Sequence, residues 1–160
     1  MSEMYFDSSV ILLDVEADTK EDVLRTMAAN LVEKNLIKDS YVEAVIAREQ
    51  EFATGLPTAG YSVAIPHTDV EHVNQKTISV AILKNPVDFG VMGDPDGTTP
   101  VKIVFLLAMD ESDAQLNLLQ RLMQVFQDED TLKFLANEQE KSKKVDLLSS
   151  KLGISSGGGE

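Results

Sequence analysis

His67, one of only two histidines among 160 residues, is the residue best placed to do chemistry. It follows Pro66 directly, where a short apolar run over 62–65 gives way to a polar segment. Residues at the end of a rigid strand commonly carry binding or catalytic groups. A neutral imidazole is a nucleophile near neutral pH, because its ordinary pKa is about 6.5. His67 is therefore the candidate reactive residue.

Three interpretations of His67 follow from its residue type and its neighbours. As a core histidine it would only pack. As a metal ligand it would need partners, and its spacing to Asp69 and His72 matches no familiar metal-binding pattern, so we predict no metal. As a nucleophile it needs one free ring nitrogen, with the other held by a hydrogen bond. Pro66 stiffens the backbone that leads into His67, and this suits a reactive histidine and an ordinary strand end equally.

Arg48 is the second candidate, in the last turn of a predicted helix. An arginine there complements the negative end of the helix dipole, which is the reading that residue type and position favour. Thr54 and Gly55 begin the next loop, where Gly55 can make the turn. Thr68 follows His67 and offers a hydroxyl group or caps the loop.

Two motifs together resemble those of a known family. The first, Arg-Glu-x-Glu-Phe-x-Thr-Gly, begins at Arg48, and the second, Ala-Ile-Pro-His, ends at His67. They resemble the enzyme IIA component of the bacterial phosphoenolpyruvate-dependent sugar phosphotransferase system (PTS), of the fructose/mannitol type and its galactitol-like subgroup. The order of predicted elements resembles the family from about residue 4 to residue 152.

The resemblance implies a phosphotransferase component that carries a phosphoryl group on histidine. His67 would accept it from the phosphocarrier protein HPr and pass it to a cysteine of the cognate enzyme IIB, serving enzyme IIC indirectly. In such in-line displacements the protein mainly positions the group and stabilises its charge. Arg48 would lie beside His67 and offer a planar set of donors to the phosphoryl oxygens. Thr54, Gly55 and Thr68 would lie in the neighbourhood of the phosphate. The implied function is uptake and phosphorylation of a sugar or sugar alcohol, with galactitol the predicted substrate, and no cofactor is implied.

One departure from the family pattern concerns a second histidine. Many mannitol- and fructose-type members carry one at the start of the long helix, in a His-Leu-x-Leu-Leu setting. Here Gln115 takes that place, in Gln-Leu-Asn-Leu-Leu. Gln115 can donate a hydrogen bond but cannot carry positive charge, which leaves Arg48 as the main charged stabiliser. His72 is the possible second histidine, or alternatively a solvated loop residue.

The elements that must position these residues form a layered α/β domain. Apolar positions at helical spacing predict helices over 20–35, 40–50, 112–127, 129–136 and 141–151. Apolar runs predict strands over 4–16 (one or two, broken at 7–9), 62–65, 77–83 and 101–109. Asp18 or Thr19 is expected to cap the first helix and Asp39 the second. The Gly, Pro and Asp residues over 90–99 predict a loop.

The alternation of helices and strands indicates a single-domain layered fold, a mixed β-sheet flanked by helices. We predict that this domain spans 1–153 and that 154–160 is a flexible tail. We also expect an apolar docking patch around His67, made of Phe52, Leu56, Pro57 and 90–93, although each of these residues could equally be core.

The composition limits the possible partners. Fourteen basic and 27 acidic residues give a net charge of −13. This charge disfavours binding to nucleic acid and to anionic membranes. It either favours a partner with a basic surface or only aids solubility. No apolar run is long enough to cross a membrane, and the first residues do not resemble a signal peptide. The chain has no cysteine, which excludes disulfides and thiol chemistry. We predict a cytoplasmic protein.

Two alternatives to the transport role remain open. In one, a domain of the same fold is regulatory, and phosphorylation of His67 controls a partner protein. In the other, the chain is a hydrolase in which His67 acts as base and Asp69 orients it. The second requires a nucleophile nearby, and the sequence contains no Gly-x-Ser-x-Gly elbow.

Overall fold

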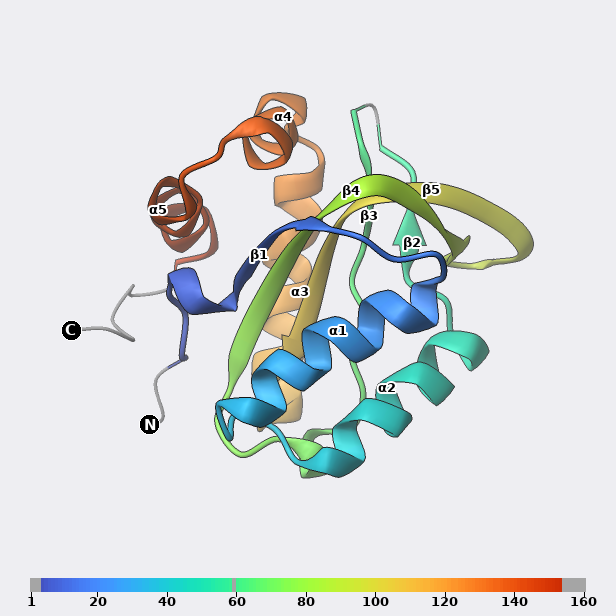
Figure 1. Ribbon diagram of the computed structural model, residues 1–160, viewed down its shortest axis with the longest axis vertical. Helices are drawn as coiled ribbons and strands as arrows, with labels where there is room; N and C mark the ends of the chain where they lie inside the picture. The colour runs from blue at the N-terminus through green and yellow to red at the C-terminus, as the bar shows by residue number, and fades with distance from the viewer. Residues whose placement is uncertain (1–3, 59, 154–160) are drawn as a thin grey trace.

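The computed structural model describes residues 4–58 and 60–153, and within them five strands form one mixed sheet with helices on both faces (Figure 1). The strands are β1 (Ile11–Val15), β2 (Gly55–Leu56), β3 (Ser62–Ala64), β4 (Thr77–Val91) and β5 (Asp94–Ala108). The helices are α1 (Lys20–Glu33), α2 (Asp39–Glu51), α3 (Ser112–Phe126), α4 (Glu129–Asn137) and α5 (Lys141–Leu152). Two short 3₁₀ helices, η1 (Ser8–Val10) and η2 (Val70–His72), complete the set. The predicted α/β fold is confirmed.

The long antiparallel pair of β4 and β5 is the centre of the sheet. β1 lies parallel to β4 on one side, and β3 lies parallel to β5 on the other. The short β2 pairs antiparallel with β3 and also meets the far end of β4, where Gly55 lies beside Val91. The pairings β4–β5–β3–β2–β4 therefore close on themselves. This closure fixes where the chain between β2 and the end of β3 must lie.

The loop predicted over 90–99 is wrong, because most of this segment continues the two central strands. Each strand is 15 residues long, and the chain turns between them at Gly93, whose φ of 79° is in the left-handed region that glycine tolerates best. Phe89 is buried and lies opposite Thr99. Cross-strand pairing and burial of Phe89 outweigh the local preference of Gly, Pro and Asp for loops.

The helices lie on both faces of the sheet, with α1 and α2 in front of it and α3 behind it in Figure 1. Thr19 caps α1 as predicted, since its side chain accepts a hydrogen bond from the backbone N–H of Asp22 at 3.2 Å. The predicted cap at Asp39 is wrong: Lys38 is the N-cap of α2, and Asp39 is its first residue. An acidic side chain in the first turn still complements the positive end of the helix dipole.

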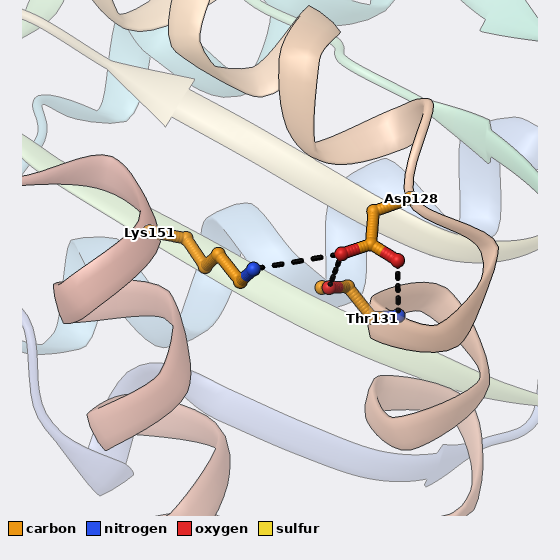
Figure 2. Close-up of polar contacts among 3 residues, drawn as sticks. All are labelled: Asp128, Thr131 and Lys151. Atoms are coloured by element: carbon orange, nitrogen blue, oxygen red, sulfur yellow. Dashed lines mark hydrogen bonds and ion pairs between the residues drawn. The ribbon is translucent and has the colours of Figure 1, made fainter.

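The two C-terminal helices are joined through Asp128, the N-cap of α4 (Figure 2). Its carboxylate accepts hydrogen bonds from the hydroxyl group of Thr131 at 2.8 Å and from the backbone N–H of the same residue at 3.4 Å. Nζ of Lys151, on α5, lies 3.5 Å from the same carboxylate. The bonds from Thr131, followed by Lys151, hold the pKa of Asp128 below its usual range. The predicted tail over 154–160 lies outside the described residues.

Candidate functional site

His67 lies just beyond the end of β3, at the edge of the sheet where β5 also ends. The two strands run parallel, with Ala64 beside Val104. Past the end of β3, the backbone N–H of Leu107 donates to the carbonyl oxygen of Pro66 at 3.0 Å. The segment that carries His67 therefore stays beside β5 up to that strand's carboxyl end. Loops held by a rigid strand in this way commonly carry binding or catalytic residues.

One ring nitrogen of His67 is held by the backbone. Nδ1 lies 2.8 Å from the carbonyl oxygen of Ile65, and because a carbonyl oxygen can only accept, Nδ1 must carry the hydrogen. In the neutral ring the lone pair is then on Nε2. Burial lowers the pKa of His67 and the charge of Arg48 lowers it further, while the bond to Ile65 opposes both effects. The lowered pKa favours the neutral ring, in which Nε2 carries the free lone pair.

Arg48 places a positive charge next to this ring. It lies in the last turn of α2, partly buried, with its guanidinium carbon 4.8 Å from the centroid of the Phe52 ring. A cation over an aromatic face is attracted to it, which restricts the arginine side chain. In the part of the chain that the structure describes, no carboxylate forms an ion pair with Arg48. Within these described residues its charge is therefore not taken up by an ion pair, and it lowers the pKa of His67.

Helix α2 and the His67 segment are attached to the same residue of β5. The buried hydroxyl group of Tyr41, on α2, donates to the carbonyl oxygen of Leu107 at 2.5 Å. The N–H of Leu107 is the group that holds Pro66. Leu107 thus fixes Arg48, through the helix, relative to His67.

A buried carboxylate that the sequence analysis did not single out supports the site from α2. Glu49 is 2% exposed; its two carboxylate oxygens accept the backbone N–H of Thr54 at 2.9 Å and the Thr54 hydroxyl at 2.8 Å. The same hydroxyl oxygen accepts the backbone N–H of Ile65 at 3.2 Å. Burial raises the pKa of Glu49, and the two bonds from Thr54 oppose that change. The chain of contacts runs from Glu49 to the residue that holds His67.

A signal for Glu49 was present in the spacing of its helix. Tyr41 and Val45 precede it at intervals of four, and residues four apart lie on one face of a helix. Both are buried, so Glu49 occupies the third position of a buried face. An acidic residue at such a position needs fixed donors.

Thr54, Gly55 and Thr68, which we expected near phosphate, are all buried. The hydroxyl of Thr54 is used by Glu49 and Ile65, as described. Gly55 allows β2 to approach β4 closely: a Cβ atom there would lie 2.4 Å from the carbonyl oxygen of Gly90. Through these contacts Thr54 and Gly55 support the backbone near the segment that carries His67.

Gln115 lies in the first turn of α3, which begins four residues after β5 ends. Its side-chain oxygen Oε1 is buried and has no hydrogen-bond partner among the described residues. The next residue, Leu116, is 57% exposed. The turn from β5 thus brings Gln115 and an exposed apolar side chain to the edge of the sheet where His67 lies.

His72 is not part of this group of residues. Its Nδ1 lies 2.8 Å from the hydroxyl oxygen of Ser40, in the first turn of α2, and its Nε2 lies 3.7 Å from a carboxylate oxygen of Glu71. Arg48 is eight residues further along the same helix, which corresponds to roughly 12 Å of helical rise. His72 therefore contacts the end of α2 that lies away from Arg48.

The residues predicted to form one docking patch line two separate hollows. Phe52 is 54% exposed and Met92 is 39% exposed; both line a hollow of about 470 Å³ between the end of α2 and the β4–β5 turn. Leu56 and Pro57 instead line a hollow of about 350 Å³ with Met123 of α3. Over the described ranges, no group of three or more acidic or histidine side chains could hold a metal ion, and no helix is long and apolar enough to cross a membrane.

Comparison with known proteins gives consistent matches over nearly the whole chain. A family model described as "Phosphoenolpyruvate-dependent sugar phosphotransferase system, EIIA 2" matches residues 4–151. The galactitol-specific EIIA component of the PTS from Escherichia coli K12 is 28% identical over 135 residues, covering 84% of this chain and 86% of that protein. The mannitol-specific phosphotransferase enzyme IIA component of Halalkalibacterium halodurans is also 28% identical, over 152 residues, covering 88% and 100%.

A solved structure supports the fold. In the complex of enzyme IIAMTL and phosphorylated enzyme IIBMTL from Escherichia coli, one chain superimposes with a TM-score of 0.69 and 24% sequence identity, covering 92% of this chain and 96% of that one. The mixed sheet and its flanking helices are therefore shared with a PTS enzyme IIA.

Proposed function

The chain belongs to the EIIA 2 family of the phosphoenolpyruvate-dependent sugar phosphotransferase system, whose members are phosphoryl carriers, and on that premise we propose that His67 is its phosphorylated residue. One observation carries this proposal. The hydrogen bond from Nδ1–H to the carbonyl oxygen of Ile65 leaves the lone pair on Nε2, beside the charge of Arg48. A carrier histidine requires such a neutral, oriented ring.

The reaction then proceeds as two in-line transfers. The Nε2 lone pair of His67 attacks the phosphorus atom of the phosphohistidine donor; the new N–P bond forms as the donor's N–P bond breaks. In the second step a thiolate of the acceptor attacks the same phosphorus atom, and the N–P bond to His67 breaks. Arg48 stabilises the negative charge on the phosphoryl oxygens in both steps, and Gln115 contributes a neutral hydrogen-bond donor.

The donor we propose is HPr and the acceptor is the cysteine of an enzyme IIB. The acidic chain, with a net charge of −13, favours basic partner surfaces, and the exposed Phe52, Met92 and Leu116 provide apolar contacts for transient docking. Relatives specific for galactitol and for mannitol are equally similar at 28% identity, which supports a sugar alcohol as the final acceptor. Galactitol remains our specific prediction, and the cytoplasm the predicted location.

The test is phosphoryl transfer from phosphoenolpyruvate through enzyme I and HPr to the wild type, His67→Ala and His72→Ala. We expect acid-labile, base-stable phosphate on the wild type and on His72→Ala, and none on His67→Ala. His72→Ala is the matched control because it removes the other histidine, at the far end of α2. An unlabelled wild type beside active enzyme I and HPr would refute the proposal. Addition of galactitol-type and mannitol-type enzyme IIB then identifies the acceptor.

A further inference from the structure

Glu49 has no part in the transfer steps described above, yet it is almost fully buried next to Arg48. We propose that Glu49 is a positioning residue for phosphoryl transfer, which acts through Thr54 on Ile65 and so holds His67 in the Nδ1–H tautomer. The kinetic part of this inference rests on the proposed function of His67. The tautomer itself does not, because it is a property of the unphosphorylated protein.

With Glu49 ionised, each hydrogen bond in this chain has one possible direction. The backbone N–H of Ile65 can only donate, and Thr54 accepts it through its hydroxyl oxygen at 3.2 Å and its carbonyl oxygen at 3.4 Å. The hydroxyl hydrogen then goes to Glu49 Oε1 at 2.8 Å, and the Thr54 backbone N–H goes to Oε2 at 2.9 Å. A carboxylate accepts on both oxygens, which is what Thr54 requires. The Glu49 carboxylate is thus matched to the two donors of Thr54.

The position of Ile65 links this arrangement to the chemistry. Its N–H is held by Thr54, and its carbonyl oxygen accepts the hydrogen of His67 Nδ1 at 2.8 Å. If the backbone at Ile65 turns, that carbonyl moves away from Nδ1, and the hydrogen is no longer held on this nitrogen. A ring with hydrogen on Nε2 has no lone pair there to attack phosphorus. The orientation of one backbone residue therefore determines which tautomer reacts.

Substitution by an amide separates this role from simple packing. Glu49→Gln preserves shape but presents an NH₂ group to one of the two donors of Thr54. If the NH₂ group faces the backbone N–H, that hydrogen bond is lost; if it faces the hydroxyl group, it donates to the hydroxyl oxygen and the hydroxyl hydrogen must turn away. Thr54→Val removes the hydroxyl at nearly constant volume, whereas Thr54→Ser retains it. Glu51→Gln is the matched control, because it makes the same chemical change in an exposed residue at the same end of α2.

The first measurement is long-range ¹H–¹⁵N NMR of the imidazoles at pH 8, which reports the tautomer of each ring. His72 is the internal reference, since it lies at the other end of α2. We expect the Nδ1–H form of His67 in the wild type, Glu51→Gln and Thr54→Ser, and a shift towards the Nε2–H form in Glu49→Gln and Thr54→Val. His72 should not change in any variant.

The second measurement is steady-state transfer from phospho-HPr. We expect kcat to fall roughly tenfold to a hundredfold in Glu49→Gln and Thr54→Val with little change in KM, because the loss is one of orientation. Folded variants that keep the wild-type tautomer and kcat would overturn the proposal. So would a Thr54→Ser variant as impaired as Thr54→Val, since the methyl group would then matter and not the hydroxyl.

Two further outcomes remain decisive. If Glu49→Gln does not fold, the comparison of valine and serine at position 54 tests the same chain of hydrogen bonds. If the wild type accepts no phosphate from HPr, the proposed function fails, while the NMR measurement still confirms or refutes the positioning of His67.

Discussion

Replacement of Gly55 by alanine tests whether the contact between β2 and β4 holds the site together. The added Cβ atom would lie 2.4 Å from the carbonyl oxygen of Gly90 and 3.2 Å from the Cβ atom of Phe89. The first separation is roughly 1 Å short of ordinary contact. Its neighbour is backbone, and the carbonyl oxygen of Gly55 is itself held by the N–H of Met92 at 2.8 Å. The strands cannot separate without loss of that bond.

The expected cost follows from these contacts. Overpacking of this kind destabilises the folded state by about 1–3 kcal/mol, against a gain of about 0.5 kcal/mol from the stiffer unfolded chain. We therefore expect Gly55→Ala to lower the free energy of unfolding by about 1–2 kcal/mol and the Tm by roughly 2–8 °C for a chain of this size. The control is Gly60→Ala, where the added atom meets only the flexible side chain of Glu129 at 3.2 Å.

The assay is urea unfolding followed by circular dichroism, combined with the transfer assay under conditions where each variant is folded. Gly60→Ala should change the free energy of unfolding by less than about 0.5 kcal/mol, as surface substitutions usually do. If Gly55→Ala were as stable as the wild type, the close contact would not constrain the strands. If it were fully stable but inactive, Gly55 would serve phosphate directly and not the packing of β2.

Three further predictions concern charge. Arg48→Gln should slow transfer by roughly a hundredfold with an unchanged urea midpoint; unchanged transfer would remove Arg48 from the mechanism. Because the pKa of His67 is lowered on folding, the unfolded chain binds a proton that the folded protein does not, so the wild type should lose stability relative to His67→Gln as the pH falls below about 6.5. Parallel unfolding curves at pH 7.5 and 5.5 would contradict this. Lys144 is buried and donates to the carbonyl oxygen of Leu135, and burial lowers its pKa to about 8. The wild type should therefore gain stability relative to Lys144→Met as the pH rises from 8 towards 10.5, and a constant difference would refute it.

The sequence predicted the elements whose signals are local. The helical spacing of apolar residues located α3, α4 and α5 to within a residue at each end, because packing of one apolar face determines a helix of that length. The β4–β5 pair was only half predicted. Its outer part contains residues that favour turns, and it is extended because the two strands pair with each other across a turn at Gly93. No local sequence pattern indicates that strand pairing.

The same distinction between local signals and long-range contacts applies to the site. His67 and Arg48 were predicted from residue type, motif and position, but their proximity arises from the attachment of α2 and of Pro66 to one residue of β5, Leu107. Glu49 was missed because a charged residue near a helix end is ordinarily solvated. Its burial depends on Thr54, which reaches it from the next segment of the chain.

The chemistry of a carrier explains why a fixed tautomer matters more here than strong basicity. A carrier histidine must give up the phosphoryl group as readily as it accepts it. Its ring therefore has to be a good nucleophile in the first step and a good leaving group in the second. In the mechanism we propose, the hydrogen is held on Nδ1 by the carbonyl oxygen of Ile65, so the Nε2–P bond would form and break without movement of a proton. The remaining barrier is the charge on the transferred group, and that charge is the same in both directions. In the same proposal Arg48, with no ion-pair partner in the described part of the chain, would stabilise that charge both when the phosphoryl group arrives and when it leaves.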